Sequence, residues 1–208
     1  MSNVDERSGK RWNKKIISMA LSLWTKSPKA YENLVSHGYL ILPSTRLLSM
    51  YKNSISQDSG LNSEMFSWMF QTAKSAGVPD SGFHGGIIID EMQVEEDLQM
   101  QRSHSSYKLV GFVDTGSECQ NMNTIVKGKS EAKLGTHALQ FIFLGYSGFR
   151  FPFCHFCTDR VAAGDIYVMF WDSVYELKKW GFKVEFAIFD GAAANRKFMK
   201  MMYPKEDP

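Results

Sequence analysis

The residues Gly86-Ile87-Ile88-Ile89-Asp90 give the clearest strand signal in this sequence. A short, continuous run of β-branched residues is typical of a strand that is buried on both faces of a sheet. The stretch Phe182–Phe189 (FKVEFAIF) has a similar character, and it too runs into an aspartate, Asp190. The two stretches therefore predict two strands of one sheet, each followed at its end by a carboxylate.

Further strands are predicted between these two stretches, over Tyr107–Val113 and Thr136–Tyr146. Apolar residues at helical spacing predict a helix over Asp165–Trp180, with Gly181 at the stop position, and a last helix over Ala192–Met202. The order of three strands, a helix, a strand and a helix favours an antiparallel meander. A right-handed crossover then leads to a strand that runs parallel to its neighbour.

The first eighty residues predict short helices instead. Four helices are expected, over residues 12–25, 27–34, 43–48 and 62–76. In the first of them, one apolar face is formed by Trp12, Ile16, Met19 and Leu23. The turn-rich stretch Gly77–Gly82 then marks a boundary between a helical region, 1–80, and a sheet region, 81–208. The helical pattern fits a helix-turn-helix and an ordinary helical bundle alike.

Composition narrows the class of protein. Of 208 residues, 44% are hydrophobic and 22% are charged, which is enough to bury a core and unlike a disordered tail. The net charge of +2 excludes a strongly cationic protein that binds its partner through overall charge alone. A local basic patch is still possible, because residues 1–80 carry 10 Lys/Arg against 6 Asp/Glu. The polar N-terminus, the lack of a long apolar run and the three cysteines argue against a signal peptide, a membrane span and a disulfide framework. These features predict an intracellular protein.

Asp90 and Asp190 are the strongest candidates for chemistry. If the crossover brings their strands side by side, two carboxylates from distant parts of the sequence meet at one sheet edge and repel each other. A hard cation such as Mg²⁺ relieves this repulsion and keeps water positions for phosphate oxygens. Two such ions can clamp the attacking and leaving oxygens of a phosphoryl transfer. The alternative is that each aspartate forms a turn or caps a helix.

Other polar residues give weaker signals. Cys154 and Cys157 form one C-x₂-C pair, and structural zinc requires four ligands, so no zinc is expected and the thiols are predicted to pack in a loop. Asp114 ends a predicted strand and is a weak candidate for the aspartate site. Glu91 follows Asp90 directly, so it should point to the opposite face of the sheet.

Three segments together resemble the catalytic core of P-element-type transposases, the THAP-associated cut-and-paste group. These segments are Gly85–Met92, Lys108–Asp114 and Phe189–Arg196. The stretch Thr136–Pro152 and the helical stretch before Gly82 also fit the pattern of this family. The resemblance extends over roughly residues 10–203.

The resemblance implies a mixed α/β, RNase H-like fold, preceded by a helix-turn-helix-like region. It also implies a DDE/D-type acidic triad that binds Mg²⁺ or Mn²⁺, with Asp90 as the first carboxylate and Asp190 as the second. In such an enzyme, metal-bound water or a DNA 3′ hydroxyl attacks a phosphodiester, and positioning and charge neutralisation provide the catalysis. The implied partner is DNA at transposon ends, and the implied location is the nucleus.

The sequence departs from this family in two ways. The third acid of the family lies beyond a large inserted domain that binds GTP, whereas this chain ends at Pro208, so the RNase H-like fold is expected to be incomplete, without GTP binding. Residues 1–80 contain no cysteine for a zinc-binding THAP module. The expectation is a transposase fragment with little strand cleavage on its own, which leaves enzymatic activity open.

Basic side chains are candidates for contacts with DNA phosphates, or for an ordinary solvated surface. They are Arg196, Lys197 and Lys200 in the helix after Asp190, and Arg46 and Lys52 in the helical region. Two hypotheses follow. The first is a transposase-derived nuclease fold that binds metal and DNA. The second is a non-catalytic remnant that binds DNA or forms a homo-oligomer through the helical region.

Overall fold

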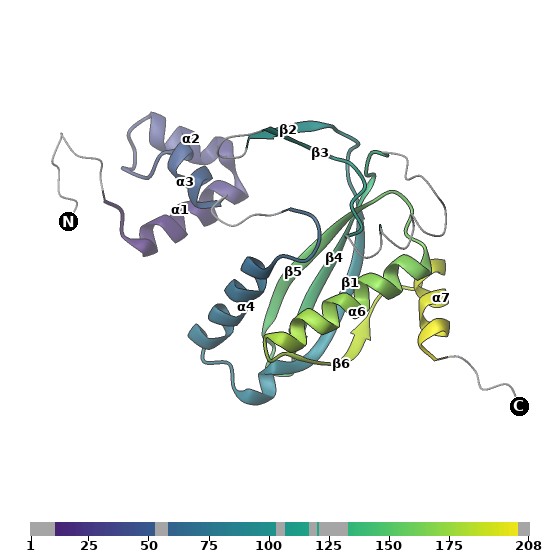
Figure 1. Cartoon of the computed structure of the whole chain (residues 1–208). Coiled ribbons are helices and arrows are strands. Elements are labelled where there is room, and N and C mark those ends of the chain that lie inside the picture. The colour runs from purple at the N-terminus through teal and green to yellow at the C-terminus, as the bar shows by residue number, and fades with distance from the viewer. Residues whose placement is uncertain (1–10, 53–57, 103–106, 117–119, 121–132, 204–208) are drawn as a thin grey trace, which may run out of the picture. The chain divides into compact units, whose positions relative to one another are not determined.

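The chain folds as two compact units, Met1–Gln57 and Asp58–Pro208 (Figure 1). The computed structural model describes residues 11–52, 58–102, 107–116, 120 and 133–203. The division lies earlier in the chain than the turn-rich stretch near residue 80 predicts, because the helix over Ser63–Ser75 packs on the sheet of the second unit. Each unit is described by itself below.

The described part of the first unit contains three helices. They are α1 (Lys14–Lys26), α2 (Pro28–Ser36) and α3 (Thr45–Lys52). The predicted start of the second helix is confirmed, since the Ser27 side chain accepts a hydrogen bond from the N–H of Ala30 and Pro28 takes the first helical position. The Tyr31 hydroxyl donates to the carbonyl of Pro43 at 2.6 Å and thereby ties α2 to the segment that leads into α3.

The inner face of α1 differs from the predicted one. Ile17 and Ala20 are buried against Tyr31 and Leu48, whereas Met19 keeps 48% of its surface exposed. The other exposed members of the predicted face are Ile16 and Leu23. The helix carries two adjacent apolar stripes, and the stripe with the small Ala20 allows the closer approach of α2 and α3. Spacing alone does not distinguish two such stripes.

The second unit is built on a four-stranded mixed sheet. Its strands are β1 (His84–Gln93), β4 (His137–Gly145), β5 (Arg150–Thr158) and β6 (Lys183–Ile188), in the order β5-β4-β1-β6. β4 is antiparallel to both β1 and β5, and β6 is parallel to β1. The predicted crossover to a parallel neighbour is therefore confirmed, whereas the antiparallel meander is made by β1, β4 and β5 and does not include the predicted strand over Tyr107–Val113.

Two details of the strand prediction are wrong. The segment with Cys154 and Cys157, which the sequence predicts as a loop, belongs to the edge strand β5. This strand accommodates Pro152 opposite Ile142 at a register shift. The predicted strand over Tyr107–Val113 is shorter and lies outside the main sheet. It forms β3 (Tyr107–Val110), which pairs with β2 (Gln99–Arg102) in a separate two-stranded ribbon.

Helices cover one face of the main sheet. They are α4 (Ser63–Ser75), α6 (Ala163–Lys179) and α7 (Ala193–Met202), and a short 3₁₀ helix (Asp80–Phe83) leads into β1. The rings of Phe66 on α4 and Phe153 on β5 lie 5.5 Å apart, and Ser173 of α6 lies against Cys154 of β5. This covered face carries Ile87, Ile89, Leu139, Phe141 and Phe143, which all belong to one buried cluster.

The other side of the sheet, here called the open face, carries the alternate residues Ile88, Asp90, Gln140, Ile142 and Ile188. Ile88 pairs with Ile142 on one side and with Ile188 on the other, and these three lie outside the buried cluster. Ile188 keeps 46% of its surface exposed. The two faces of one sheet therefore have different environments, although their residues alternate along the same strands. Among the described residues, no helix is long and apolar enough to cross a membrane.

Candidate functional site

Asp90 and Asp190 belong to neighbouring parallel chain segments. Asp190 comes after β6, as predicted, but the prediction that Asp90 ends its strand is wrong, because β1 continues to Gln93. Ile88 of β1 pairs with Ile188 of β6, and each aspartate comes two residues after its isoleucine. Both aspartates are exposed. The predicted adjacency of the two strands is confirmed, and in the parallel register each aspartate comes two residues after one of the paired isoleucines.

Asp90 lies on the open face, because it has the same parity along β1 as Ile88. Its Oδ1 accepts a hydrogen bond from the N–H of Glu91 at 3.0 Å. The Glu91 side chain has the opposite parity, and its Oε1 accepts a hydrogen bond at 3.1 Å from the hydroxyl of Thr158, which is buried. Glu91 therefore belongs to the other side of the strand, as the sequence predicts.

Asp190 also forms the turn that leads into α7, whose N-cap residue is Ala192. Its Oδ1 accepts hydrogen bonds from the backbone N–H of Ala192 at 3.0 Å and from Nδ2 of Asn195 at 2.6 Å. These donors, with the Ala192 N–H first, lower the pKa of Asp190 below its usual value. The carboxylate is thus ionised at neutral pH, and both bonds use the same oxygen. A turn-forming role and a ligand role are compatible at this residue.

A row of polar side chains crosses the sheet beside Asp90. Gln140 of β4 is the register partner of Asp90 on one side and of His155 on the other. Burial lowers the pKa of His155, although the charges of Asp114 and Asp58 oppose this shift. Sequence reasoning missed Gln140 and His155, since their relation to Asp90 depends on register. The alternation in β4, where Leu139 and Phe141 are buried on either side of Gln140, was the available signal.

Asp114 does not join the aspartates. Its backbone N–H donates to the carbonyl of Cys157 at 2.7 Å, so it lies along β5, two strands away from β1. In the part of the chain that the structure describes, no three His, Cys, Asp or Glu side chains come together as a metal site. Asp90 and Asp190 nevertheless suit a hard divalent cation, since both are exposed oxygen donors and such an ion completes its coordination with water or phosphate oxygens.

The two cysteines of the C-x₂-C pair lie on opposite faces of β5. Cys154 points into the core, where burial raises its pKa and its sulfur lies 4.0 Å from the hydroxyl of Ser173. Cys157 has the opposite parity, and burial together with the charge of Asp114 raises its pKa. A strand separates the sulfurs, so this pair does not form a chelate. The prediction of a loop is wrong here, but the prediction of packed thiols holds for Cys154.

Basic side chains occur in both units. Arg196, Lys197 and Lys200 are exposed on α7, and the Arg196 guanidinium donates to the carbonyl of Gly191. In the first unit, Arg46 and Lys52 are exposed on α3. Residues 11–52 carry seven basic side chains and one acid, which are Arg11, Lys14, Lys15, Lys26, Lys29, Arg46 and Lys52 against Glu32. Residues 11–52 therefore carry a larger excess of positive charge than residues 1–80 do as a whole.

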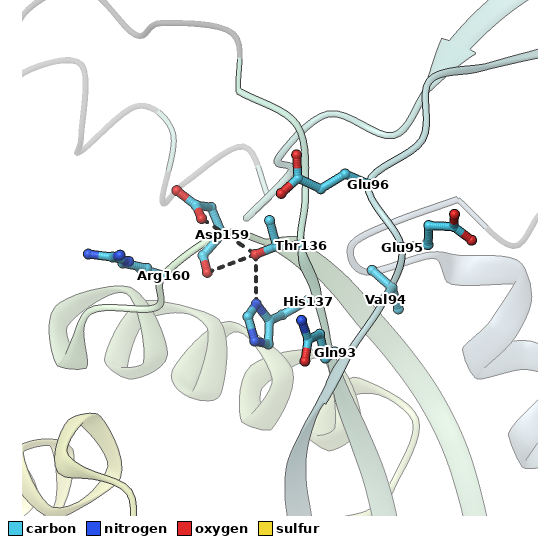
Figure 2. Close-up of a pocket in the computed structure, with 8 residues that line it drawn as sticks. All are labelled: Gln93, Val94, Glu95, Glu96, Thr136, His137, Asp159 and Arg160. Carbon is cyan, nitrogen blue, oxygen red and sulfur yellow. Dashed lines mark hydrogen bonds between the residues drawn. The ribbon is translucent and has the colours of Figure 1, made fainter.

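A polar cleft of about 610 Å³ lies beyond the end of β1 (Figure 2). In it, Oγ1 of Thr136 lies 2.7 Å from Nδ1 of His137 and hydrogen-bonds to Asp159. The lining residues are Gln93, Val94, Glu95, Glu96, Thr136, His137, Asp159 and Arg160. Three acids against one arginine make this cleft unsuited to phosphate, and its central polar groups bond to one another.

A mixed sheet that is covered by helices on one face, with one aspartate in a strand and another just after its parallel neighbour, is typical of an RNase H-like domain. The family model described as TNP-like, RNase H N-terminal domain, matches residues 57–203, and the chain belongs to this family. The match begins where the second unit begins. The predicted fold class and the resemblance to P-element-type transposases are therefore confirmed.

A solved structure gives a similar result. The chain resembles the protein in the Drosophila P element transposase strand transfer complex, with a TM-score of 0.62 and 20% sequence identity. The similarity covers 97% of this chain and 38% of that chain. At this level of identity the likeness concerns the fold. No curated protein matches the chain.

Proposed function

We propose that this chain is a transposase-derived DNA-binding domain that holds a divalent cation, Mg²⁺ or Mn²⁺, between Asp90 and Asp190. The observation that carries the proposal is the parallel register of β1 and β6, which aligns Ile88 with Ile188 two residues before the aspartates. The similarity to the protein in the P element transposase strand transfer complex supports DNA as the partner. A nuclear location follows from a DNA substrate.

The residues of this chain have defined parts in this proposal. The carboxylates of Asp90 and Asp190 hold the cation, and the Ala192 and Asn195 donors keep Asp190 oriented and ionised. When bound, the cation supplies charge neutralisation at a phosphodiester and lowers the pKa of bound water. Lys197 and Lys200 on α7 contact DNA phosphates next to the aspartates. Since the described residues offer two carboxylates, strand cleavage by this chain alone is expected to be weak.

Substitution of the aspartates tests this proposal. We expect D90A and D190A each to weaken Mn²⁺ binding in titration calorimetry without a loss of fold, because each removes a charged oxygen ligand. E95A is the matched control, since it removes an exposed acid from the segment after β1. Equal Mn²⁺ affinity in all four proteins, or no Mn²⁺ binding by the unmodified chain, would contradict the proposal.

A second function is favoured by the charge of residues 11–52. Seven basic residues against one acid provide the electrostatic footprint of a nucleic-acid-binding unit. We expect the double variant R46A/K52A to reduce DNA affinity and the salt dependence of binding in fluorescence anisotropy, while D90A/D190A leaves both unchanged. An unchanged DNA affinity in R46A/K52A would show that other residues make the DNA contacts.

A further inference from the structure

Part of the apolar surface of α1 is exposed. Ile16, Met19 and Leu23 keep 37%, 48% and 41% of their surfaces exposed. They lie at positions i, i+3 and i+7, so they form one line along the helix, here called the α1 seam. The inner stripe with Ile17 and Ala20 packs in the buried cluster of the first unit instead. The helix is therefore apolar on two sides, which is typical of a helix that packs against a further partner.

The spacing of the α1 seam indicates that this partner is a helix. Steps of three and four residues repeat the pattern of a coiled-coil seam, in which the apolar side chains of two helices interlock. The seam is also narrow, because other outward positions of α1 hold Ser18, Ser22 and Thr25. A helix that lies in a membrane surface needs a broad apolar face, and DNA is bound mainly through its charged phosphates. A protein helix therefore fits the seam better than a lipid surface or DNA does.

The charges beside the α1 seam define the chemistry of the partner. Lys15 lies four residues before Met19, and Lys26 lies seven residues after it, so both border the seam. Both lysines are exposed, and α1 contains no Asp or Glu. In helix pairs, the charged residues beside the apolar seam select a partner of opposite charge. A second copy of α1 would bring lysines against lysines, so an acidic helix is the better complement.

We propose that the α1 seam docks an amphipathic helix of a partner protein, in which Asp and Glu side chains border the apolar residues. The apolar residues of the partner helix cover the seam, and its carboxylates face Lys15 and Lys26. The inference goes beyond the proposed function, since every residue in it belongs to the first unit and none to the cation site. It also uses a different helix from Arg46 and Lys52, which belong to α3.

Two designed peptides test the inference on the full chain. Both are about three heptads long with Leu at positions a and d, and they carry either Glu or Lys at positions e and g. Fluorescence anisotropy of the labelled peptides measures their affinities. We expect the Glu peptide to bind about ten-fold more tightly than the Lys peptide or better, and its affinity to fall as the salt concentration rises. Equal affinities, or no binding of the Glu peptide, would overturn the inference.

Substitutions in the α1 seam identify the surface that binds. M19Q/L23Q keeps the helix propensity but removes two apolar side chains, and we expect it to weaken binding of the Glu peptide by about ten-fold or more. L40Q/M50Q is the matched control, because it removes two exposed apolar side chains elsewhere in the first unit. Circular dichroism checks that all variants keep their helix content. If M19Q/L23Q binds the Glu peptide as the unmodified chain does, the seam is not the docking site and the inference is overturned.

Charge reversal tests the chemistry of the partner. We expect K15E/K26E to bind the Lys peptide more tightly than the Glu peptide, because the charges that border the seam are inverted. An unchanged preference for the Glu peptide would overturn the inference, since the two lysines would then play no part in recognition.

Three further measurements cover the other occupants of the α1 seam. They are sedimentation equilibrium, anisotropy with duplex DNA, and flotation with vesicles of phosphatidylcholine and phosphatidylserine. We expect M19Q/L23Q to match the unmodified chain in all three. A dimer that the substitutions dissociate, or a loss of DNA or vesicle binding, would assign the seam to that occupant and overturn the inference.

Discussion

The covered face and the open face of the sheet use alternate residues of the same strands for different purposes. On the covered face, Phe141 and Phe143 are fully buried under helices. On the open face, Ile142 is half-buried and Gln140 and Asp90 occupy the next row. The covered face therefore carries the stability of the second unit. The open face tolerates exposed carboxylates, because they stay in contact with water when the protein folds. A charged binding site therefore costs the least folding free energy on this face.

The largest expected effect is a difference in stability between neighbours on β4. We expect F141A to lower the free energy of unfolding by about 3–5 kcal/mol, because it removes a buried ring and leaves a cavity. I142A, on the open face, should cost roughly 1–2 kcal/mol, since its side chain is only half-buried. Urea unfolding measures both values. Equal losses would show that the open face is as buried as the covered one.

A smaller effect is expected at the close approach of β1 and β6. A Cβ on Gly86 would lie 2.2 Å from the ring of Phe186 and 2.5 Å from its carbonyl oxygen. We expect G86A to destabilise the fold by about 1–3 kcal/mol, because β6 must move away from β1. G164A is the matched control, since nothing lies within 4 Å of its added Cβ. A neutral G86A would contradict the described packing of the two strands.

The smallest expected effect is on the pH dependence of stability. Hydrogen bonds from Lys183, Tyr146 and His84 lower the pKa of Glu185 from 4.5 to about 2. A carboxyl whose pKa is lower in the folded state stabilises the fold above the unfolded pKa, and this contribution is lost as the pH falls toward the folded pKa. The stability advantage of the unmodified protein over E185Q should therefore shrink from pH 4.5 toward pH 2.

Urea unfolding along this pH range provides the measurement, with E95Q as the control at an exposed acid outside the network. A constant difference between the unmodified protein and E185Q would show that the Glu185 network does not hold in solution.

Much of the fold could be predicted because its strongest signals are local. The apolar runs before Asp90 and Asp190 gave two strands, and the intervening helix gave their parallel relation. The edge strand β5 escaped prediction because Pro152 interrupts the strand pattern and the C-x₂-C pair suggested a loop, although its phenylalanines favour a strand and the paired β4 strand holds the segment extended. The inner stripe of α1 depended on which neighbours approach it most closely, which its own sequence does not encode.

The candidate site was only partly accessible to sequence reasoning. Asp90 and Asp190 could be identified because each follows an apolar strand. Gln140 and His155 could not, since no motif marks them and their position beside Asp90 arises from the register of three strands. The mistaken idea that Asp114 could approach the site came from its place at a strand end, without knowledge that this segment pairs with Cys157.

The most direct test of the central claim is a crystal structure of the full chain grown with Mn²⁺, in which anomalous scattering locates the ion. We expect an Mn²⁺ peak bonded to carboxylate oxygens of both Asp90 and Asp190. A well-ordered structure in which the two side chains diverge, or in which Mn²⁺ binds only at other residues, would contradict it.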